Sequence, residues 1–265
     1  MQTPTNDILN QNSLCAALGK DAEGLSVYVF EELDSTNTYA KRIAIDDADA
    51  RPLLIVAERQ TAGRGRMGRD FFSPDKTGVY FSISYTAHAP LESAVTVTCA
   101  ASVAVMRAIR RLCGVQTEIK WVNDLYLNGK KVCGILTEAV SAEHATRVIV
   151  GVGINLSTAV FPIELTEKAG ALGCTNVSRA EMIAAVWQEL KPYFADVTNA
   201  SWLQDYRSYS CVIGKEITWM REEEHYTGTA TGIDDSGALA VRMANGDTEY
   251  LRTGEISVRL NNKTV

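Results

Sequence analysis

Short runs of β-branched and alternating hydrophobic residues recur along the first 160 residues of the chain, a pattern that predicts strands. Four of these runs are residues 25–33, 53–58, 79–85 and 147–156. Two more, 118–127 and 131–140, flank Asn128-Gly129, a dipeptide that strongly favours a hairpin turn. This part of the chain therefore predicts a sheet with at least one antiparallel hairpin.

Helical segments separate these strands. Residues 34–37 (Asp-Ser-Thr-Asn) offer several N-cap side chains before a helix predicted at 38–45. Residues 91–112 predict a long alanine-rich helix whose last turns carry arginines, which suit a helix C-terminus. Ser178 and Glu181 form a capping box that opens a helix to about residue 194. Shorter helices are predicted at 8–19 and 201–209.

The pattern changes after residue 214. Four short alternating runs follow within about fifty residues, separated by the turn sequences Asp235-Ser236-Gly237 and Asn245-Gly246. The runs are residues 216–220, 226–233, 238–243 and 248–251. Closely spaced short strands of this kind predict a small β-barrel. We therefore expect an α+β chain of two domains, residues 1–211 and 212–265.

Composition narrows the class of protein. The 265 residues include 46% hydrophobic and 22% charged residues, values that are typical of a folded globular chain. The net charge of −6 argues against a dedicated duplex-DNA binder. There is no apolar run of about 20 residues and no signal sequence, so we expect a cytoplasmic protein without a membrane span. Six scattered cysteines without a C-x-x-C pair predict free thiols.

A glycine-arginine segment, residues 63–69, is the first candidate for chemistry. Residues 63–68 match G-x-G-x-x-G, but the dinucleotide fingerprint must open a helix, and here Pro74 and another predicted strand follow. A P-loop would need Lys-Ser/Thr where Arg69-Asp70 stand. Three arginines among three glycines suit an anion, because arginine forks and exposed backbone N–H groups bind phosphate. A solvated loop without a ligand explains this segment alone equally well.

Three other segments admit two interpretations each. Lys131, after the hairpin turn, can neutralise a carboxylate or phosphate, or it can be a solvated turn lysine. Gly151 and Gly153 indicate either the close approach of a ligand or a simple bulge. The polar residues 35–37 either bind a ligand or only cap a helix.

Taken together, these segments resemble the biotin protein ligases (biotin–[acetyl-CoA-carboxylase] ligases), whose motifs occur here in the family's order between about residues 25 and 260. The matching segments are Asp34-Ser35-Thr36-Asn37, Glu58-x-Gln60-x-Ala62-Gly63-Arg64-Gly65-Arg66-x-Gly68-Arg69, Lys120-Trp121-x-Asn123-Asp124 with Lys131-x-x-Gly134-Ile135-Leu136, Gly151-x-Gly153-Ile154-Asn155, and the late strand Gly254-Glu255-Ile256-Ser257-Val258-Arg259.

The resemblance implies a class II synthetase-like catalytic domain, with a mixed sheet flanked by helices, followed by a small SH3-like β-barrel. It also implies the reactants: biotin, ATP with Mg²⁺, and a biotin carboxyl carrier protein, either an acetyl-CoA carboxylase subunit or the carrier of another biotin-dependent carboxylase. Biotin is activated as biotinyl-5′-AMP, and the carrier's lysine then attacks this anhydride. We expect a monomer or weak homodimer.

Site residues follow from the resemblance position by position. For biotin, Ser35, Thr36, Asn37 and Gln60 would hold the ureido ring, with Gly134 beside them. A loop of Arg64, Gly65 and Arg66 would close over the adenylate, and Lys131 would contact the biotin carboxylate and the α-phosphate, so that Lys131 and Arg66 are the expected catalytic residues. The nucleotide would be bound by Arg69, Phe71, Asn123, Asn155 and, from the small domain, Arg259, with Asp124 as the expected metal ligand.

Three departures from the family's pattern matter. Phe71 stands where relatives often carry tryptophan, which keeps an aromatic partner for adenine but loses the indole N–H. Val122 replaces a common proline. The residues before Asp34 leave too little chain for the winged helix-turn-helix of the bifunctional members, so repressor activity is not expected.

Two alternatives remain open at this point. A lipoate or octanoate protein ligase or transferase belongs to the same superfamily, and a transferase would need a nucleophile such as cysteine or lysine at the acyl site. A non-catalytic biotin sensor would bind biotin without releasing pyrophosphate. Arg66 and Lys131 argue against a sensor, which needs no phosphate site.

Overall fold

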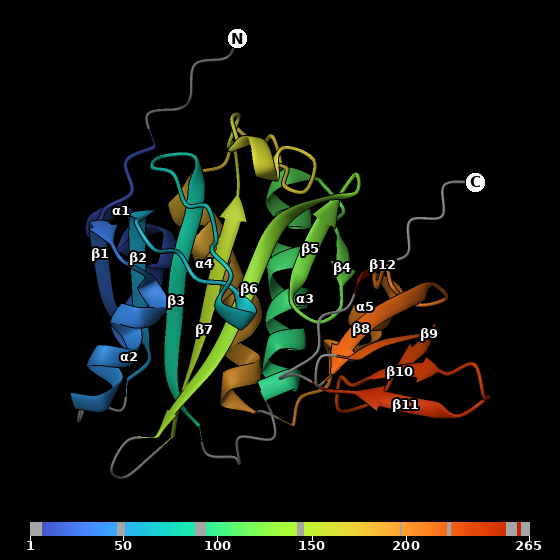
Figure 1. The fold of residues 1–265 in the computed structure, drawn as a ribbon. Coiled ribbons are helices and arrows are strands. Elements are labelled where there is room, and N and C mark those ends of the chain that lie inside the picture. Colours follow the sequence, from blue (N-terminus) through green and yellow to red (C-terminus); the bar gives the residue numbers. More distant parts are fainter. Residues whose placement is uncertain are drawn as a thin grey trace.

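The computed structural model describes residues 7–46, 51–87, 94–141, 146–196, 198–221, 224–252 and 259–260. Seven strands form one sheet, in the order β1-β2-β3-β7-β6-β5-β4 (Figure 1). Only β1 and β2 are parallel, and every other pair of neighbours is antiparallel. The strands are β1 (Ser26–Leu33), β2 (Leu53–Gln60), β3 (Gly78–Ala87), β4 (Glu118–Lys120), β5 (Asp124–Leu127), β6 (Lys130–Ser141) and β7 (Thr146–Asn155).

Helices cover the two faces of this sheet unequally. In Figure 1, α3 (Ala94–Cys113) and α4 (Arg179–Ala195) lie behind the sheet, and α2 (Thr36–Asp46) lies in front of it. α1 (Gln11–Leu18) packs against α4. The alternation of β3 explains this division, because Val79, Phe81 and Ile83 enter the main hydrophobic core whereas Ser82 faces α2. The mixed sheet flanked by helices agrees with the fold expected above.

The second sheet is antiparallel and has the order β11-β10-β9-β8-β12. Its strands are β8 (Glu216–Arg221), β9 (Glu224–Ile233), β10 (Leu239–Arg242), β11 (Thr248–Leu251) and β12 (Arg259–Leu260). α5 (Leu203–Ser208) precedes it. The turn after β9 docks on the first domain, where the indole Nε1 of Trp121 donates to Gly237 O at 2.9 Å. A Cβ at Gly237 would lie 3.0 Å from the Cys99 Sγ of α3, a tight contact, and the positive φ of this residue (83°) also favours glycine.

Most predicted elements are confirmed, and the Asn128-Gly129 turn has the positive φ angles (51° and 76°) that this dipeptide favours. The continuous strand predicted at 118–127 is wrong. The chain reverses at residues 121–123 and forms two antiparallel strands, β4 and β5. Tertiary contacts favour the reversal, because Tyr206 Oη donates to Val122 O and the Asn123 side chain donates to Ile135 O.

The strand predicted at 254–259 falls largely outside the described residues. Arg259 begins β12 and lies opposite Thr218 of β8. None of the described helices is long and apolar enough to cross a lipid bilayer.

A buried ion triad joins three distant parts of the first domain. Arg179, the first residue of α4, is 1% exposed. Its Nε and backbone N–H donate to the Asp7 carboxylate at 2.8 and 3.0 Å, and its Nη1 and Nη2 donate to Glu58 at 2.5 and 3.0 Å. Glu58 lies on β2 two residues before Gln60, so the triad anchors the end of the strand that leads into the glycine-arginine loop.

We expect Arg179→Met to lower the free energy of unfolding by about 3–5 kcal/mol, because it leaves two poorly solvated carboxylates without their cation. Urea denaturation followed by fluorescence measures this. Lys191→Met, which breaks the more exposed Lys191–Asp21 pair, is the matched control and should cost no more than about 1 kcal/mol. Equal losses for the two variants would contradict this account of the triad.

Candidate active site

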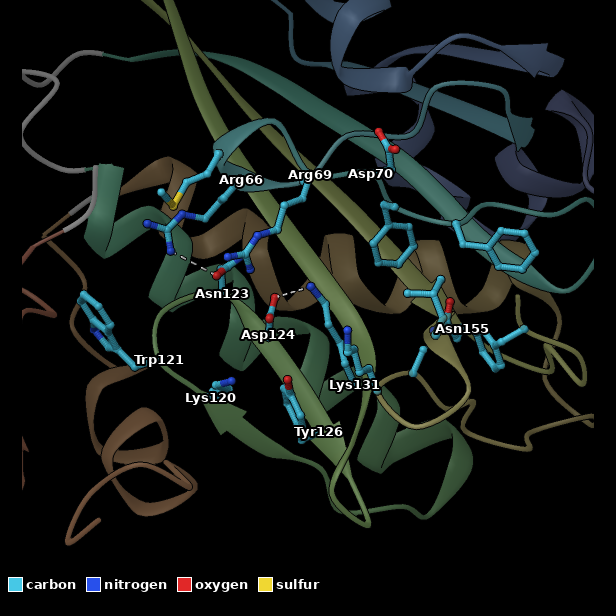
Figure 2. Close-up of a pocket in the computed structure, with 18 residues that line it drawn as sticks. Arg66, Arg69, Asp70, Lys120, Trp121, Asn123, Asp124, Tyr126, Lys131 and Asn155 are labelled. Atoms are coloured by element: carbon cyan, nitrogen blue, oxygen red, sulfur yellow. Dashed lines mark hydrogen bonds and ion pairs between the residues drawn. The ribbon is translucent and has the colours of Figure 1, made fainter. Parts of the chain in front are cut away.

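Two cavities lie on the front of the sheet and share one wall residue, Phe71. The smaller has a volume of about 30 Å³ and the larger about 290 Å³. Residues expected to bind biotin line the smaller cavity: Ser35, Thr36, Asn37, Gln60, Arg64 and Gly134. Gly65, Arg66, Arg69, Asn123, Asp124, Lys131 and Asn155 line the larger cavity (Figure 2). The structure thus brings together the expected site residues of the first domain and divides these residues into two compartments. Arg259 lies in β12 of the second sheet.

Polar side chains at the start of α2 form the floor of the smaller cavity. The first N–H of the helix, at Thr36, is capped by the Gln60 Oε1 atom of β2 at 2.9 Å. Asn37 is 3% exposed, and its Nδ2 donates to Leu136 O and to Glu138 Oε2 on β6. The Ser82 hydroxyl lies 2.6 Å from Asn37 Oδ1. Because the cap comes from Gln60, helix capping alone does not explain residues 35–37.

Three strand glycines let side chains lie directly on the sheet. A Cβ at Gly151 would lie 2.1 Å from Asn37 Oδ1, and a Cβ at Gly153 would lie 2.5 Å from the Phe71 ring. Gly134 is the direct neighbour of Gly153 across the β6–β7 ladder, and it also approaches Phe71. The register of β6 and β7 is regular throughout, so the bulge interpretation of Gly151 and Gly153 is wrong. Close approach is the reason for glycine here.

The glycine-arginine segment forms a narrow hairpin between β2 and β3. Phe71 N donates to Gly63 O at 2.9 Å, and Gly65 N donates to Arg69 O at 2.7 Å. A short 3₁₀ turn, Arg66–Gly68, closes the tip. No helix follows, which confirms that the segment is neither a dinucleotide fingerprint nor a P-loop.

Positive charge dominates the larger cavity (Figure 2). Its lining includes the cations Arg66, Arg69, Lys120 and Lys131 and the carboxylates Asp70 and Asp124. Lys131 Nζ pairs with Asp124 Oδ1 at 2.7 Å. Arg66 Nη1 donates to Asn123 Oδ1 at 3.3 Å, while its buried Nη2 has no hydrogen-bond partner. Burial lowers the pKa of Arg66 and that of Lys120 from their ordinary values, and the Asp124 carboxylate opposes both shifts. This excess of cations is suited to an anionic ligand.

The backbone around Lys131 is held on both sides. Its N–H donates to Lys168 O at 2.8 Å, and its carbonyl accepts from Gly170 N at 2.9 Å. Gly170 O in turn accepts from the Asn155 side chain at 3.0 Å. The loop after β7 therefore fixes the position from which the Lys131 side chain enters the cavity.

A metal site is less clearly defined than the anion site. The part of the chain that the structure describes contains no group of three or more His, Cys, Asp or Glu side chains that could hold a metal ion. Asn155 Oδ1 is buried without a partner and, like Asp124, lines the larger cavity. Carboxylate and amide oxygens of this kind suit Mg²⁺ when a substrate phosphate completes the shell.

Sequence reasoning gave no individual role to several residues of the site, although Lys120 stood in one of the motifs. Ser82 and Glu138 complete the floor of the smaller cavity, and Lys120 and Tyr126 line the larger one. The Lys120 ammonium lies 5.3 Å from the centre of the Tyr126 ring. A polar residue beside apolar neighbours in a predicted strand was the available signal for Ser82 and Glu138. Their partner Asn37, however, is 45 and 101 residues away, respectively.

Comparisons with known proteins match two separate stretches of the chain. Residues 29–155 match the biotin/lipoate A/B protein ligase family, and residues 212–259 match the biotin protein ligase C terminal domain. The bifunctional ligase/repressor BirA of Bacillus subtilis is 33% identical over 90% of this chain and 76% of its own length. The biotin–[acetyl-CoA-carboxylase] ligase of Mycobacterium tuberculosis is 29% identical over 86% of this chain and 87% of its own.

A solved structure is similar over nearly the same extent. The biotin protein ligase from Aquifex aeolicus, in complex with biotin and ATP, has a TM-score of 0.73 at 26% identity and covers 89% of this chain and 99% of its own. The chain belongs to the biotin protein ligase family.

Gly151→Ala tests the close approach of Asn37. The new methyl group would overlap an amide that is held by three hydrogen bonds, so we expect the free energy of unfolding to fall by about 1–3 kcal/mol. Gly232→Ala, in β9, is the control because no atom lies within 4 Å of its Cβ position, and it should change stability by no more than about 0.5 kcal/mol. If both variants unfold at the wild-type urea concentration, Asn37 is not confined as described.

Proposed function

We propose that the protein is an ATP-dependent biotin protein ligase, which forms biotinyl-5′-AMP and transfers biotin to a lysine of a biotin carboxyl carrier protein. The observation that carries this proposal is the pair of adjoining cavities, one small with a polar floor and one rich in cations, joined at Phe71. The relatives support it, since they are named biotin ligases and the similar Aquifex structure holds biotin and ATP.

In this proposal the smaller cavity takes the ureido ring of biotin. Ser35, Thr36, Asn37 and Gln60 supply hydrogen-bonding groups, and Arg64 lies at the wall. The Phe71 ring lies directly over Gly134 and Gly153, between the two cavities, so the aliphatic chain would pass beside this ring to reach the larger cavity. The carboxylate would then enter beside Lys131.

The first step joins two anions. An oxygen of the biotin carboxylate attacks the α-phosphorus of ATP, the bond from that phosphorus to the β-phosphate oxygen breaks, and pyrophosphate leaves. Lys131 and Arg66, with Arg69 and Lys120 nearby, would offset the repulsion and stabilise the charge that develops. Arg66 Nη2 is buried without a partner and is therefore available to a phosphate oxygen.

The nucleotide would occupy the larger cavity, bound by Arg69, Asn123 and Asn155, with Phe71 against the adenine and Arg259 reaching from the small domain. Asp124 and Asn155 are the residues that would hold Mg²⁺ together with the phosphates. The ion would add positive charge at the phosphates.

In the second step the amine of the carrier lysine attacks the biotinyl carbonyl carbon, an amide forms, and AMP leaves. No protein nucleophile is needed. Among the described residues no cysteine lines either cavity. Cys133 lies two residues after Lys131 but is fully buried on the core side, and burial raises the pKa of its thiol.

Partners and assembly follow from the same proposal. The carrier would be an acetyl-CoA carboxylase subunit or the carrier of another biotin-dependent carboxylase, and the enzyme would act in the cytoplasm as a monomer or weak homodimer. Its net charge of −6 is unfavourable for duplex DNA binding, so we infer no role as a repressor.

Single-turnover pyrophosphate release with MgATP tests the function and Lys131 together. We expect the wild-type protein to release pyrophosphate with biotin and not with lipoate. Lys131→Ala should slow this step about 100- to 1,000-fold, since losing a positioned charge contact costs about 3–4 kcal/mol of transition-state stabilisation. Transfer from supplied biotinyl-5′-AMP to a carrier domain should fall much less.

Lys130→Ala is the matched control. Lys130 donates to Thr166 O rather than entering the larger cavity, and its removal should leave pyrophosphate release within about twofold of the wild-type rate. Unchanged release by Lys131→Ala would remove Lys131 from the mechanism, and release with lipoate alone would contradict the proposed substrate.

Arg66→Gly tests whether the arginine retains the adenylate. Loss of about 2–3 kcal/mol of contact would raise the dissociation rate of biotinyl-5′-AMP roughly 30- to 150-fold, because such losses are expressed mostly in dissociation. Escaped adenylate acylates exposed lysines, so biotin incorporation into albumin should rise at equal adenylation rates. Met67→Gly also places a glycine in the tip of the hairpin, at an exposed position on the rim of the same cavity, without removing charge. Equal albumin labelling by Arg66→Gly and Met67→Gly would mean that the charge is not the retaining feature.

A further inference from the structure

Glu138, on β6, lies between the floor of the smaller cavity and the glycine-arginine loop. Its side chain is only 18% exposed, yet its carboxylate contacts three residues from two parts of the chain, α2 and the glycine-arginine loop. Oε2 accepts from Asn37 Nδ2 at 2.9 Å, and Oε1 lies 2.5 Å from Lys41 Nζ and 3.7 Å from Arg64 Nη1. A single side chain thus contacts both a floor residue and a loop residue of the same cavity.

The first contact fixes which way the Asn37 amide points. Glu138 and the Leu136 carbonyl are acceptors only, so the two Nδ2 hydrogens must face them. Oδ1 then faces Ser82, whose hydroxyl must donate because an amide oxygen has no proton. With the amide reversed, its oxygen would meet two acceptors, so Glu138 holds Asn37 in one orientation.

The second contact acts on the loop. Arg64 lines the smaller cavity and pairs in an antiparallel bridge with Asp70, so its position is coupled to the whole hairpin. Its side chain is the more exposed member of the pair, 46% against 18% for Glu138. Attraction to a carboxylate anchored on β6 draws this partly exposed cation toward the cavity.

We propose that Glu138 is a positioning residue for biotin. Its carboxylate orients the Asn37 amide at the floor of the smaller cavity, and it attracts Arg64 of the glycine-arginine loop toward the same cavity. The inference rests on the proposed function, since it concerns the pocket assigned there to biotin. Glu138 does not line the larger cavity, so it acts on binding and retention of biotin rather than on attack at phosphorus.

Two substitutions separate the contacts. Glu138→Gln keeps an oxygen that can accept from Asn37 but removes the charge that attracts Arg64, and we expect it to raise the Kd for biotin about three- to tenfold. Glu138→Ala also removes the acceptor of Asn37 and should raise the Kd about 10- to 100-fold. The rate of pyrophosphate release at saturating biotin should stay within about twofold in both variants. Isothermal titration and single-turnover release measure the two effects.

A double-substitution cycle identifies the route. In an Arg64→Ala background, Glu138→Gln should have no further effect on the Kd, whereas Glu138→Ala should still weaken binding through Asn37. Lys41→Met is the matched control, because Lys41 contacts the same carboxylate but lines neither cavity, and its Kd should stay within about twofold of the wild-type value. Multiplicative effects of Arg64→Ala and Glu138→Gln, or an effect of Lys41→Met as large as that of Glu138→Gln, would overturn the proposal.

Trypsin provides a measurement that needs no ligand. Cleavage after Arg64, Arg66 or Arg69 in the ligand-free protein should be several-fold faster in Glu138→Gln than in the wild type or Lys41→Met, at unchanged unfolding midpoint. Equal cleavage would show that Glu138 does not hold the loop. Failure of the wild-type protein to bind biotin would instead contradict the proposed function, and the tryptic comparison would still decide whether Glu138 holds Arg64.

Discussion

The absence of side chains at Gly134, Gly151 and Gly153 is the constraint on which the site depends. Asn37 approaches Gly151, and Phe71 approaches Gly153, to distances that a Cβ would forbid, while Gly134 lies beside Gly153 in the β6–β7 ladder and makes a tight contact with Phe71. The floor of the smaller cavity and the wall between the two cavities are made by these two approaches. Larger residues at these positions would move Asn37 and Phe71 outward, and the two compartments would no longer have their present shape.

The central strands supply a regular scaffold, and strand ends together with the connections between strands supply the charges. β3 and β7 are buried over most of their length, and the β3–β7 and β6–β7 pairings are regular. Arg66, Arg69 and Asn123 lie in the connections between strands, whereas Asp124 and Lys131 lie near the ends of β5 and β6. Such a division is common, because loops on a rigid scaffold can carry polar groups that a core cannot. Here two features hold the loops in place. The triad of Arg179 anchors β2 before the hairpin, and backbone bonds from residues 168–170 hold Lys131.

How far the sequence predicts this structure depends on the range of the interactions. Local signals were sufficient for the Asn128-Gly129 turn, for the capping box at Ser178, and for rejecting a helix after Gly68. They failed at residues 118–127, where contacts with Tyr206 and Gly237 reverse the chain. They also gave no reason to join Glu138 with Asn37 and Arg64, because such contacts depend on the finished sheet. Membership of the site was predictable from the motifs, but its division at Phe71 was not.

The hydrogen bond from Trp121 to Gly237 O connects the small second sheet to the first domain and holds the Trp121 side chain in place. Trp121 lines the larger cavity, and the acceptor of its indole N–H lies in the turn between β9 and β10. A chain cut after α5 would keep the charged lining contributed by the first domain. The indole of Trp121 would lose its hydrogen-bond acceptor, and the surface around Cys99 and Val95 would be exposed to water. The second sheet therefore supports the Trp121 part of the cavity wall from outside, through residues that do not themselves line the cavity.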